Sequence, residues 1–353
     1  MSKPNVQTRP AFPVSKLVST LLISLLLIVA FPERFYPQSQ SKQDEDVIRV
    51  DTDLTNLFFI ATDKQKRFVT TLQEADVQVI EDGTPQRILL FQHETDRPVS
   101  LAFLIDVSGS EEPTMGEEKA AARAFIERVI RSKGDEAAII PFVEHAFLEQ
   151  SFTGNLLVLY KVLNQVDVAN PLYFGVGKPI GGIASEPGGP ALIQGSTAIW
   201  DAITVTSNEI MAARPGKRRA IILLTDGQDN GSRVKRQVAI ERAIAAETVI
   251  YVIGIGEHVE KDQLRNVAEG SGGAAFFPKK EVDLISAFAE IERELRSQYL
   301  IAYSSSNKNR DGSYRQLRIE ITNPELKKEQ LKLRYRPGYF AKRFSSNAVG
   351  GQR

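Results

Sequence analysis

Between residues 98 and 297, apolar runs of strand length alternate with amphipathic segments of helical length. The runs at 99–106, 219–226 and 248–255 are mostly apolar, which is typical of strands that helices cover on both faces. A segment such as 117–130 instead repeats its apolar residues with helical spacing. This alternation predicts an α/β fold with a doubly wound, mostly parallel sheet and helices on both of its faces.

The other elements of this region follow from the same patterns. Residues 145–153 are expected to form an antiparallel neighbour of the apolar strand that precedes them. Further helices are expected at 155–166, 197–214, 234–246, 260–269 and 281–297, and a short strand is expected at 274–277.

Two β-rich segments flank the α/β region. Residues 47–97 contain alternating runs and an Asp-Gly turn, and residues 298–341 contain three more alternating strands. We expect the two segments to pack together as one small β-sandwich-like module that the α/β domain, 98–297, interrupts. A short tail, 342–353, follows the last expected strand.

The first 37 residues have the layout of an export signal. Lysine and arginine precede an apolar run at 17–31, and no acidic residue comes before that run. We predict either a cleaved signal peptide or an N-terminal segment that sits in the membrane as an anchor, followed in both cases by a polar linker at 38–46. The basic flank stays in the cytoplasm, so the remainder is expected in the periplasm or cell envelope, or secreted.

Composition excludes several classes of function. The chain has 353 residues, 44 basic and 44 acidic, so no basic surplus indicates nucleic-acid binding. It has no cysteine, which excludes disulfides, cysteine-based zinc sites and a thiol nucleophile. The three histidines do not form a zinc-binding pattern. A metal site in this chain is therefore expected to use oxygen ligands.

Oxygen-bearing side chains gather at three expected strand or helix ends. The first apolar strand ends in D-V-S-G-S, which carries Asp106, Ser108 and Ser110. A Gly-Ser-Thr stretch ending in Thr197 opens a helix, and another apolar strand runs into Asp226 within T-D-G. Ligands of open α/β sheets bind at the carboxyl ends of strands. The five side chains are hard donors that suit Mg²⁺, or alternatively Mn²⁺ or Ca²⁺.

The charge of this donor set predicts its use. The set offers only two carboxylates, and the other three donors are neutral hydroxyls. If Asp226 acts through a water molecule, a divalent cation is poorly neutralised by the groups that bind it directly. An open coordination position would then attract a carboxylate from outside the chain. The alternative is that the two aspartates only cap the helices that follow them.

These three motifs resemble the three loops of the metal-ion-dependent adhesion site in von Willebrand factor A domains. The resemblance covers about 98–300 and implies a Rossmann-like fold whose cation is held by the five residues named above. It also implies a protein partner that binds through an aspartate or glutamate side chain. The segments V-x-V-x-E-D-G-x-P-Q, at 77–86, and R-P-G-Y, at 336–339, resemble those of bacterial envelope proteins related to this family.

One segment departs from the family's pattern. A glycine- and proline-rich insert at 171–195 leads directly into the loop of Thr197. We hypothesise that Leu172, Tyr173 and Phe174 rim the metal site and contribute to the choice of partner. The alternative is a solvated loop without such a role.

Enzymatic readings fit the sequence less well, and we do not expect an enzyme. A phosphatase with a strand-terminal aspartate over Mg²⁺ uses D-x-D, whereas this chain has Ser108 at the second position. There is no G-x-S-x-G elbow and no phosphate-binding loop. The prediction is thus an exported or anchored protein that binds a protein partner through a cation. Two alternatives are an envelope scaffold without cation-dependent binding and, less favoured, a Mg²⁺-dependent phosphohydrolase.

Overall fold

The structure is a computed structural model that describes residues 54–93, 97–131, 134–168, 178–181, 196–256 and 258–343. By its contacts the chain divides into Met1–Val50 and Asp51–Arg353, and all of these described residues belong to the second unit. The expected export signal and linker lie outside the described residues. Within those residues, no helix combines the length and apolarity needed to cross a bilayer.

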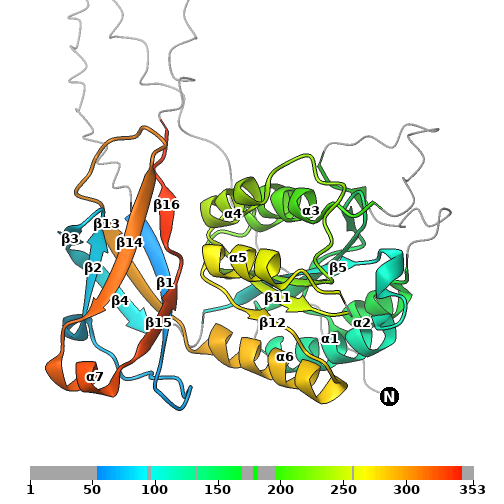
Figure 1. Cartoon of the computed structure of the whole chain (residues 1–353), viewed down its shortest axis with the longest axis horizontal. Helices are drawn as coiled ribbons and strands as arrows, with labels where there is room; N and C mark the ends of the chain where they lie inside the picture. Colours follow the sequence, from blue (N-terminus) through cyan, green and yellow to red (C-terminus); the bar gives the residue numbers. More distant parts are fainter. Residues whose placement is uncertain are drawn as a thin grey trace, which may run out of the picture. The chain divides into compact units, whose positions relative to one another are not determined.

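A six-stranded sheet forms the centre of the α/β domain, in the order β12-β11-β10-β5-β6-β8 (Figure 1). Its strands are β5 (Val99–Asp106), β6 (Glu136–Phe142), β8 (Gln150–Thr153), β10 (Arg218–Thr225), β11 (Thr248–Gly254) and β12 (Ala275–Phe276). All neighbours are parallel except β6 and β8, which are antiparallel, as the sequence predicted for 145–153. Every residue of β5 is buried, because helices cover both faces of the sheet.

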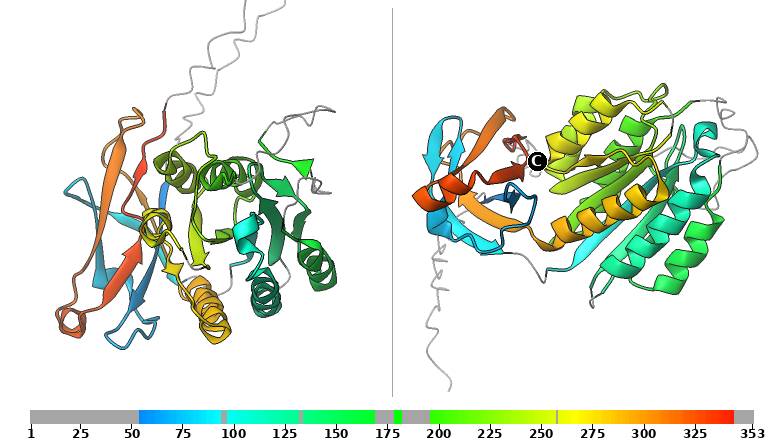
Figure 2. Two further views of the ribbon diagram at one scale, coloured as in Figure 1. Left: turned by 45° about the vertical axis from the view of Figure 1, so that its right-hand side comes forward. Right: turned by 60° about the horizontal axis from the view of Figure 1, so that its bottom comes forward.

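Each face of this sheet carries three helices (Figures 1 and 2). One face packs against α1 (Met115–Val129), α2 (Leu156–Gln165) and α6 (Glu281–Arg296). The other packs against α3 (Ile199–Val205), α4 (Arg236–Ala245) and α5 (Lys261–Ser271). On the first face, the Phe125 ring meets Phe103 edge-on at 5.8 Å and Phe288 at 4.8 Å, which ties α1 to β5 and α6. The predicted fold class is confirmed.

One helix expectation was wrong. The spacing of apolar residues predicted a single helix over 197–214, but α3 ends at Val205 and a π-helical turn, Thr206–Met211, follows. The apolar stripe continues through this turn, with Met211 fully buried. A change of hydrogen-bonding pattern by one residue leaves such a stripe almost unaltered, so the sequence did not reveal it.

The flanking segments form a β-sandwich from two four-stranded sheets. The order of one sheet is β15-β1-β13-β4 and that of the other is β16-β14-β2-β3. The bounds are β1 (Leu54–Thr62), β2 (Val77–Glu81), β3 (Thr84–Gln86), β4 (Ile88–His93), β13 (Tyr299–Ser304), β14 (Tyr314–Ile321), β15 (Lys332–Tyr335) and β16 (Gly338–Phe340). Strand β1 pairs with both β13 and β15, so segments from both ends of the sequence interleave (Figure 1).

The remaining short elements are α7 (Pro324–Glu329) in the sandwich, two 3₁₀ turns (Glu74–Asp76 and Gly109–Glu111), and the two-residue strands β7 (Phe147–Leu148) and β9 (Lys178–Pro179), which pair with each other. The sandwich has its own apolar core. At its centre the rings of Phe59 and Tyr299 stack with their centroids 4.9 Å apart. This packing joins β1 to β13, the strand that directly follows α6.

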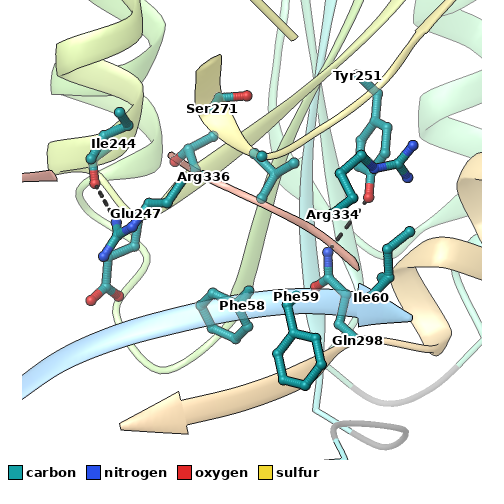
Figure 3. Close-up of a pocket in the computed structure, with 13 residues that line it drawn as sticks. Phe58, Phe59, Ile60, Ile244, Glu247, Tyr251, Ser271, Gln298, Arg334 and Arg336 are labelled. Atoms are coloured by element: carbon teal, nitrogen blue, oxygen red, sulfur yellow. Dashed lines mark hydrogen bonds between the residues drawn. The ribbon is translucent and has the colours of Figure 1, made fainter. Parts of the chain in front are cut away.

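Strand β1 also contacts the α/β domain. The side chain of Asn56 donates to Glu247 Oε1 at 3.0 Å, and Arg336 Nη2 donates to the Asn56 carbonyl at 2.7 Å. Figure 3 shows the cavity beside these contacts, with Arg336 directed toward the Ile244 carbonyl. Its volume is about 20 Å³, enough for about one water molecule. This cavity is therefore too small to be a ligand site.

Candidate metal centre

The carboxyl ends of β5 and β10 meet in the middle of the parallel sheet. Their register pairs Ile105 with Leu224, so the following residues, Asp106 and Thr225, are neighbours. The chain leaves β5 toward β6 on one side, whereas β10 pairs with β5 on the other side. This reversal of strand order is the place where open α/β sheets bind ligands.

The first loop turns tightly around the carboxylate of Asp106. Its Oδ1 accepts the backbone N–H of Ser108 at 3.0 Å, and a 3₁₀ turn, Gly109–Glu111, follows. The hydroxyl oxygens of Ser108 and Ser110 lie 3.0 Å apart. Asp106 and Ser108 are buried, whereas Ser110 is exposed. The structure therefore brings the three donors of the D-V-S-G-S motif into one turn, as the sequence predicted.

The loop after β10 is bonded directly to this turn. Thr225 Oγ1 donates to Asp106 Oδ2 at 2.6 Å and accepts the N–H of Gly227 at 3.1 Å. Asp226, which is 4% exposed, accepts from the backbone N–H and the side-chain amide of Gln228. Gly227 has φ 86°, a left-handed conformation that favours glycine, and a Cβ there would lie 2.9 Å from Leu264.

The segment of Thr197 is bonded to the loop that follows β10. It is 5% exposed and precedes α3. Its backbone N–H donates to Asn230 Oδ1 at 2.7 Å, and its carbonyl accepts from the N–H groups of Asn230 and Gly231 at 3.1 and 2.9 Å. The segment that carries Thr197 is thus hydrogen-bonded to the loop that carries Asp226.

Two acidic residues at the site were missed by the sequence analysis. Glu111 and Glu118 are each 1% exposed, and Glu111 Oε1 accepts the backbone N–H of Asp226 at 2.8 Å. Glu118 accepts from the Thr114 hydroxyl at 2.7 Å through Oε1, whereas its Oε2 is buried without a hydrogen-bond partner. A signal was present for Glu118, because it lies one helical turn before the buried pair of alanines in α1.

Burial shapes the protonation of these carboxyls. It raises the pKa of Asp106 from 3.8 to about 6, with Asp226 adding to the effect and hydrogen bonds from Thr225 and Ser108 opposing it. Burial and the neighbouring carboxylates raise the pKa of Glu111, and burial raises that of Glu118. Glu111 and Glu118 interact directly, so they share protons as a pair.

The donor set fits a divalent cation. Carboxylate oxygens of Asp106, Glu111 and Asp226 lie within 4.8 Å of one another, a separation that one ion can bridge. Across the described residues, no lysine or arginine forms an ion pair with any of these three carboxylates. Buried carboxylates without a basic partner are compensated by protons or by a metal ion.

The three residues predicted to contact the partner cannot be compared with this geometry. Leu172, Tyr173 and Phe174 lie outside the described residues, as does most of the insert at 171–195. The hypothesis that they rim the site is not tested by the structure.

Comparison with known proteins addresses the α/β domain. The sequence model of the von Willebrand factor type A domain matches residues 190–290, a range that contains Thr197 and Asp226 but not Asp106. No protein of established function gives a significant match to the sequence.

Several solved structures are similar in fold. Proximal thread matrix protein 1 from the mussel byssus, solved with a zinc-occupied adhesion-site motif, has 18% identity and a TM-score of 0.48 over 61% of this chain. This chain spans about half of that protein's length, 50%. BatB from Bacteroides thetaiotaomicron has 17% identity and a TM-score of 0.42, with 56% of this chain and 100% of that chain covered.

A von Willebrand factor type A protein from Catenulispora acidiphila covers 85% of this chain and 76% of its own, with 12% identity and a TM-score of 0.45. The family match and the observed sheet agree with the resemblance noted in the three loops. The chain thus contains, within its α/β domain, a segment at 190–290 that matches the von Willebrand factor type A domain.

Proposed function

We propose that this protein binds a partner protein through a divalent cation. The cation is held by Asp106, Ser108, Ser110, Thr197 and Asp226, with Mg²⁺ as the expected ion and Mn²⁺ or Ca²⁺ as alternatives. The match of residues 190–290 to the von Willebrand factor type A domain supports a role in protein interaction. The cation and the identity of the five ligands are our own proposal.

One observation carries this proposal. Asp106 and Asp226 are buried at adjacent strand ends, and no basic side chain of the described residues neutralises them. Burying a carboxylate without a counter-charge is costly. A bound cation removes this cost, whereas helix capping alone, the alternative reading of the two aspartates, leaves it in place.

The partner is proposed to supply an aspartate or glutamate side chain. Of the five proposed ligands, only Asp106 and Asp226 carry a carboxylate. Three neutral hydroxyls complete the set. If Asp226 acts through a water molecule, only one carboxylate binds the divalent cation directly. The cation then keeps positive character, which favours an external carboxylate at an open coordination position.

The insert and the N-terminus add two further proposals. Leu172, Tyr173 and Phe174 are proposed to contact the partner, and a variant with all three replaced by alanine should fold normally but lose the partner. Normal partner binding by this variant would refute that role. The basic flank and apolar run at the N-terminus support export across the cytoplasmic membrane, with the mature protein in the cell envelope or secreted.

A cation-dependent capture experiment tests the main proposal. Immobilised full-length protein is exposed to envelope extract in Mg²⁺ or in EDTA, next to Asp106→Ala and a control, Asp262→Ala, whose carboxylate is 99% exposed. We expect a partner retained by the wild type and the control in Mg²⁺ only, and released by millimolar acetate. Equal retention in EDTA would instead support the scaffold alternative.

The phosphohydrolase alternative has its own test. Hydrolysis of a generic phosphate monoester in Mg²⁺ should not exceed the background, because Ser108 occupies the position where D-x-D phosphatases carry their acid. Turnover that Asp106→Ala abolishes would favour the enzyme.

A further inference from the structure

Four consecutive residues of the loop that follows Asp226 are hydrogen-bonded to the segment that leads into α3. We call Asp229, Asn230, Gly231 and Ser232 the clasp. They follow β10 and face residues 196–201, so one loop contacts both the Asp226 position and the Thr197 position. None of the four belongs to the proposed donor set.

The clasp fixes the peptide groups on both sides of Thr197. The Thr197 N–H donates to Asn230 Oδ1 at 2.7 Å, and its carbonyl accepts from Asn230 N at 3.1 Å and from Gly231 N at 2.9 Å. Three hydrogen bonds therefore fix the orientation of this residue's backbone, from which its hydroxyl projects.

The clasp also satisfies the first N–H groups of α3. Asp229 Oδ1 accepts from Ile199 N at 2.8 Å, and Ser232 Oγ accepts from Trp200 N at 2.9 Å. In return, Asp201 Oδ1 accepts the N–H groups of the two residues after the clasp, at 3.1 and 3.0 Å. The first N–H groups of α3 have no partner within their own helix, so the clasp takes the place of a local cap.

Gly231 brings the two loops into direct contact. A Cβ at this position would lie 2.2 Å from Ser196 Oγ and 3.3 Å from the Thr197 carbonyl. A side chain at this position therefore requires the Ser196 hydroxyl to turn away and the Thr197 carbonyl to shift by a few tenths of an ångström. The requirement for glycine here is steric, since no left-handed backbone conformation is involved.

We propose that the clasp sets cation affinity by positioning Thr197 relative to Asp226, without touching the ion. This inference rests on the proposed function. Asn230 and Gly231 are positioning residues in this account, and Thr197 is the ligand through which they act. The inference rests on one observation. Asp226 directly follows β10, and the loop after Asp226 is hydrogen-bonded to the backbone of Thr197, the second donor.

Calorimetric titration of the full chain with Mg²⁺ alone tests this role. Asn230→Ala should weaken Mg²⁺ binding by about 10–100-fold, the usual effect of removing a residue that orients a metal ligand. The matched control is Asn155→Ala, because Asn155 caps α2 by accepting from Leu157 N and Val158 N at 3.0 and 3.4 Å. The control should lower thermal stability in EDTA to a similar extent and leave Mg²⁺ affinity unchanged.

Two further variants separate positioning from general destabilisation. Asn230→Asp keeps the acceptor for the Thr197 N–H and should bind Mg²⁺ within about three-fold of the wild type or more tightly. Gly231→Ala should lose affinity although all five donors are intact, with its fold checked by far-UV circular dichroism.

The outcomes are distinguishable. If the wild type binds Mg²⁺ and both Asn230→Ala and Gly231→Ala bind it equally well, the clasp inference is wrong and the proposed function stands. An equal loss in Asn155→Ala would also overturn it. If the folded wild type itself fails to bind Mg²⁺, the proposed function fails and the inference fails with it.

Discussion

Replacing Asp106 with asparagine should stabilise the ion-free protein while it removes cation binding. The carboxyl is fully buried, and this burial raises its pKa from 3.8 to about 6. The difference corresponds to about 3 kcal/mol, since each pKa unit is worth about 1.4 kcal/mol. Asparagine has nearly the same shape. Its Oδ1 can accept from Ser108 N, and its Nδ2 would take the place of Oδ2 and donate to the Thr225 hydroxyl, which can turn to accept.

The sign of the effect follows from proton linkage. The unfolded chain loses the Asp106 proton near pH 3.8, and the folded, ion-free protein loses it near pH 6. Rising pH therefore favours the unfolded state through this window, and the wild type loses stability that the asparagine variant keeps. The free energy of unfolding of the variant should exceed that of the wild type by an amount that grows by about 2.4 kcal/mol between pH 4 and pH 7.5.

Urea unfolding in EDTA, followed by far-UV circular dichroism at each pH, measures this difference. Asp262→Asn is the control, because that carboxylate is 99% exposed and should give a difference that does not change with pH. Saturating Mg²⁺ should stabilise the wild type and leave the asparagine variant unaffected. A variant less stable than the wild type at pH 7.5, or a pH-independent difference, would refute the reasoning.

Two predictions concern the fold. Glu81 is 2% exposed and accepts from the hydroxyls of Tyr303 and Tyr339 at 2.7 and 3.0 Å. Glu81→Leu leaves one buried and one half-buried donor without this acceptor and should cost about 2–4 kcal/mol in urea unfolding. Mg²⁺ affinity should not change, and a loss of stability below about 1 kcal/mol would contradict the assigned role. A Cβ at Gly273 would lie 2.0 Å from the Ile250 carbonyl oxygen. Gly273→Ala should therefore shift β11 and lower the unfolding temperature by several degrees. An unchanged unfolding temperature would contradict this, because it would mean that the backbone adjusts freely there.

The layered fold could be predicted because its signals are local. Buried strands such as β5 are apolar throughout, and helices such as α1 show a clear stripe. The interleaved sandwich was also predicted from the composition of its two segments. The π-helical turn Thr206–Met211 was not, because the apolar stripe is the same on either side of the change in hydrogen bonding.

The sandwich motifs turn out to have a structural explanation. Glu81, from the segment at 77–86, accepts from the hydroxyl of Tyr339, from the R-P-G-Y segment. Gly338 packs so closely that a Cβ would lie 2.3 Å from the Arg315 carbonyl. Two motifs that resembled those of envelope proteins are therefore partners in one core, which sequence spacing alone did not indicate.

The residues of the candidate site were likewise only partly predicted from the sequence. The sequence placed Asp106 and Asp226 at strand ends, and the register of β5 and β10 brings those ends together. Glu111 was overlooked because an acidic residue next to a second acid and a proline looks like a solvated loop. Its burial depends on the tertiary hydrogen bond to Asp226 N, which no local pattern encodes.

The most direct test of the account is calorimetric titration of the ion-free full chain with Mg²⁺. We predict saturable binding at a single site in the wild type, and no binding by Asp106→Ala with an unchanged circular dichroism spectrum. A folded wild type that releases no heat and gains no thermal stability from Mg²⁺, Mn²⁺ or Ca²⁺ would contradict the central claim. Equal binding by Asp106→Ala would contradict it as well.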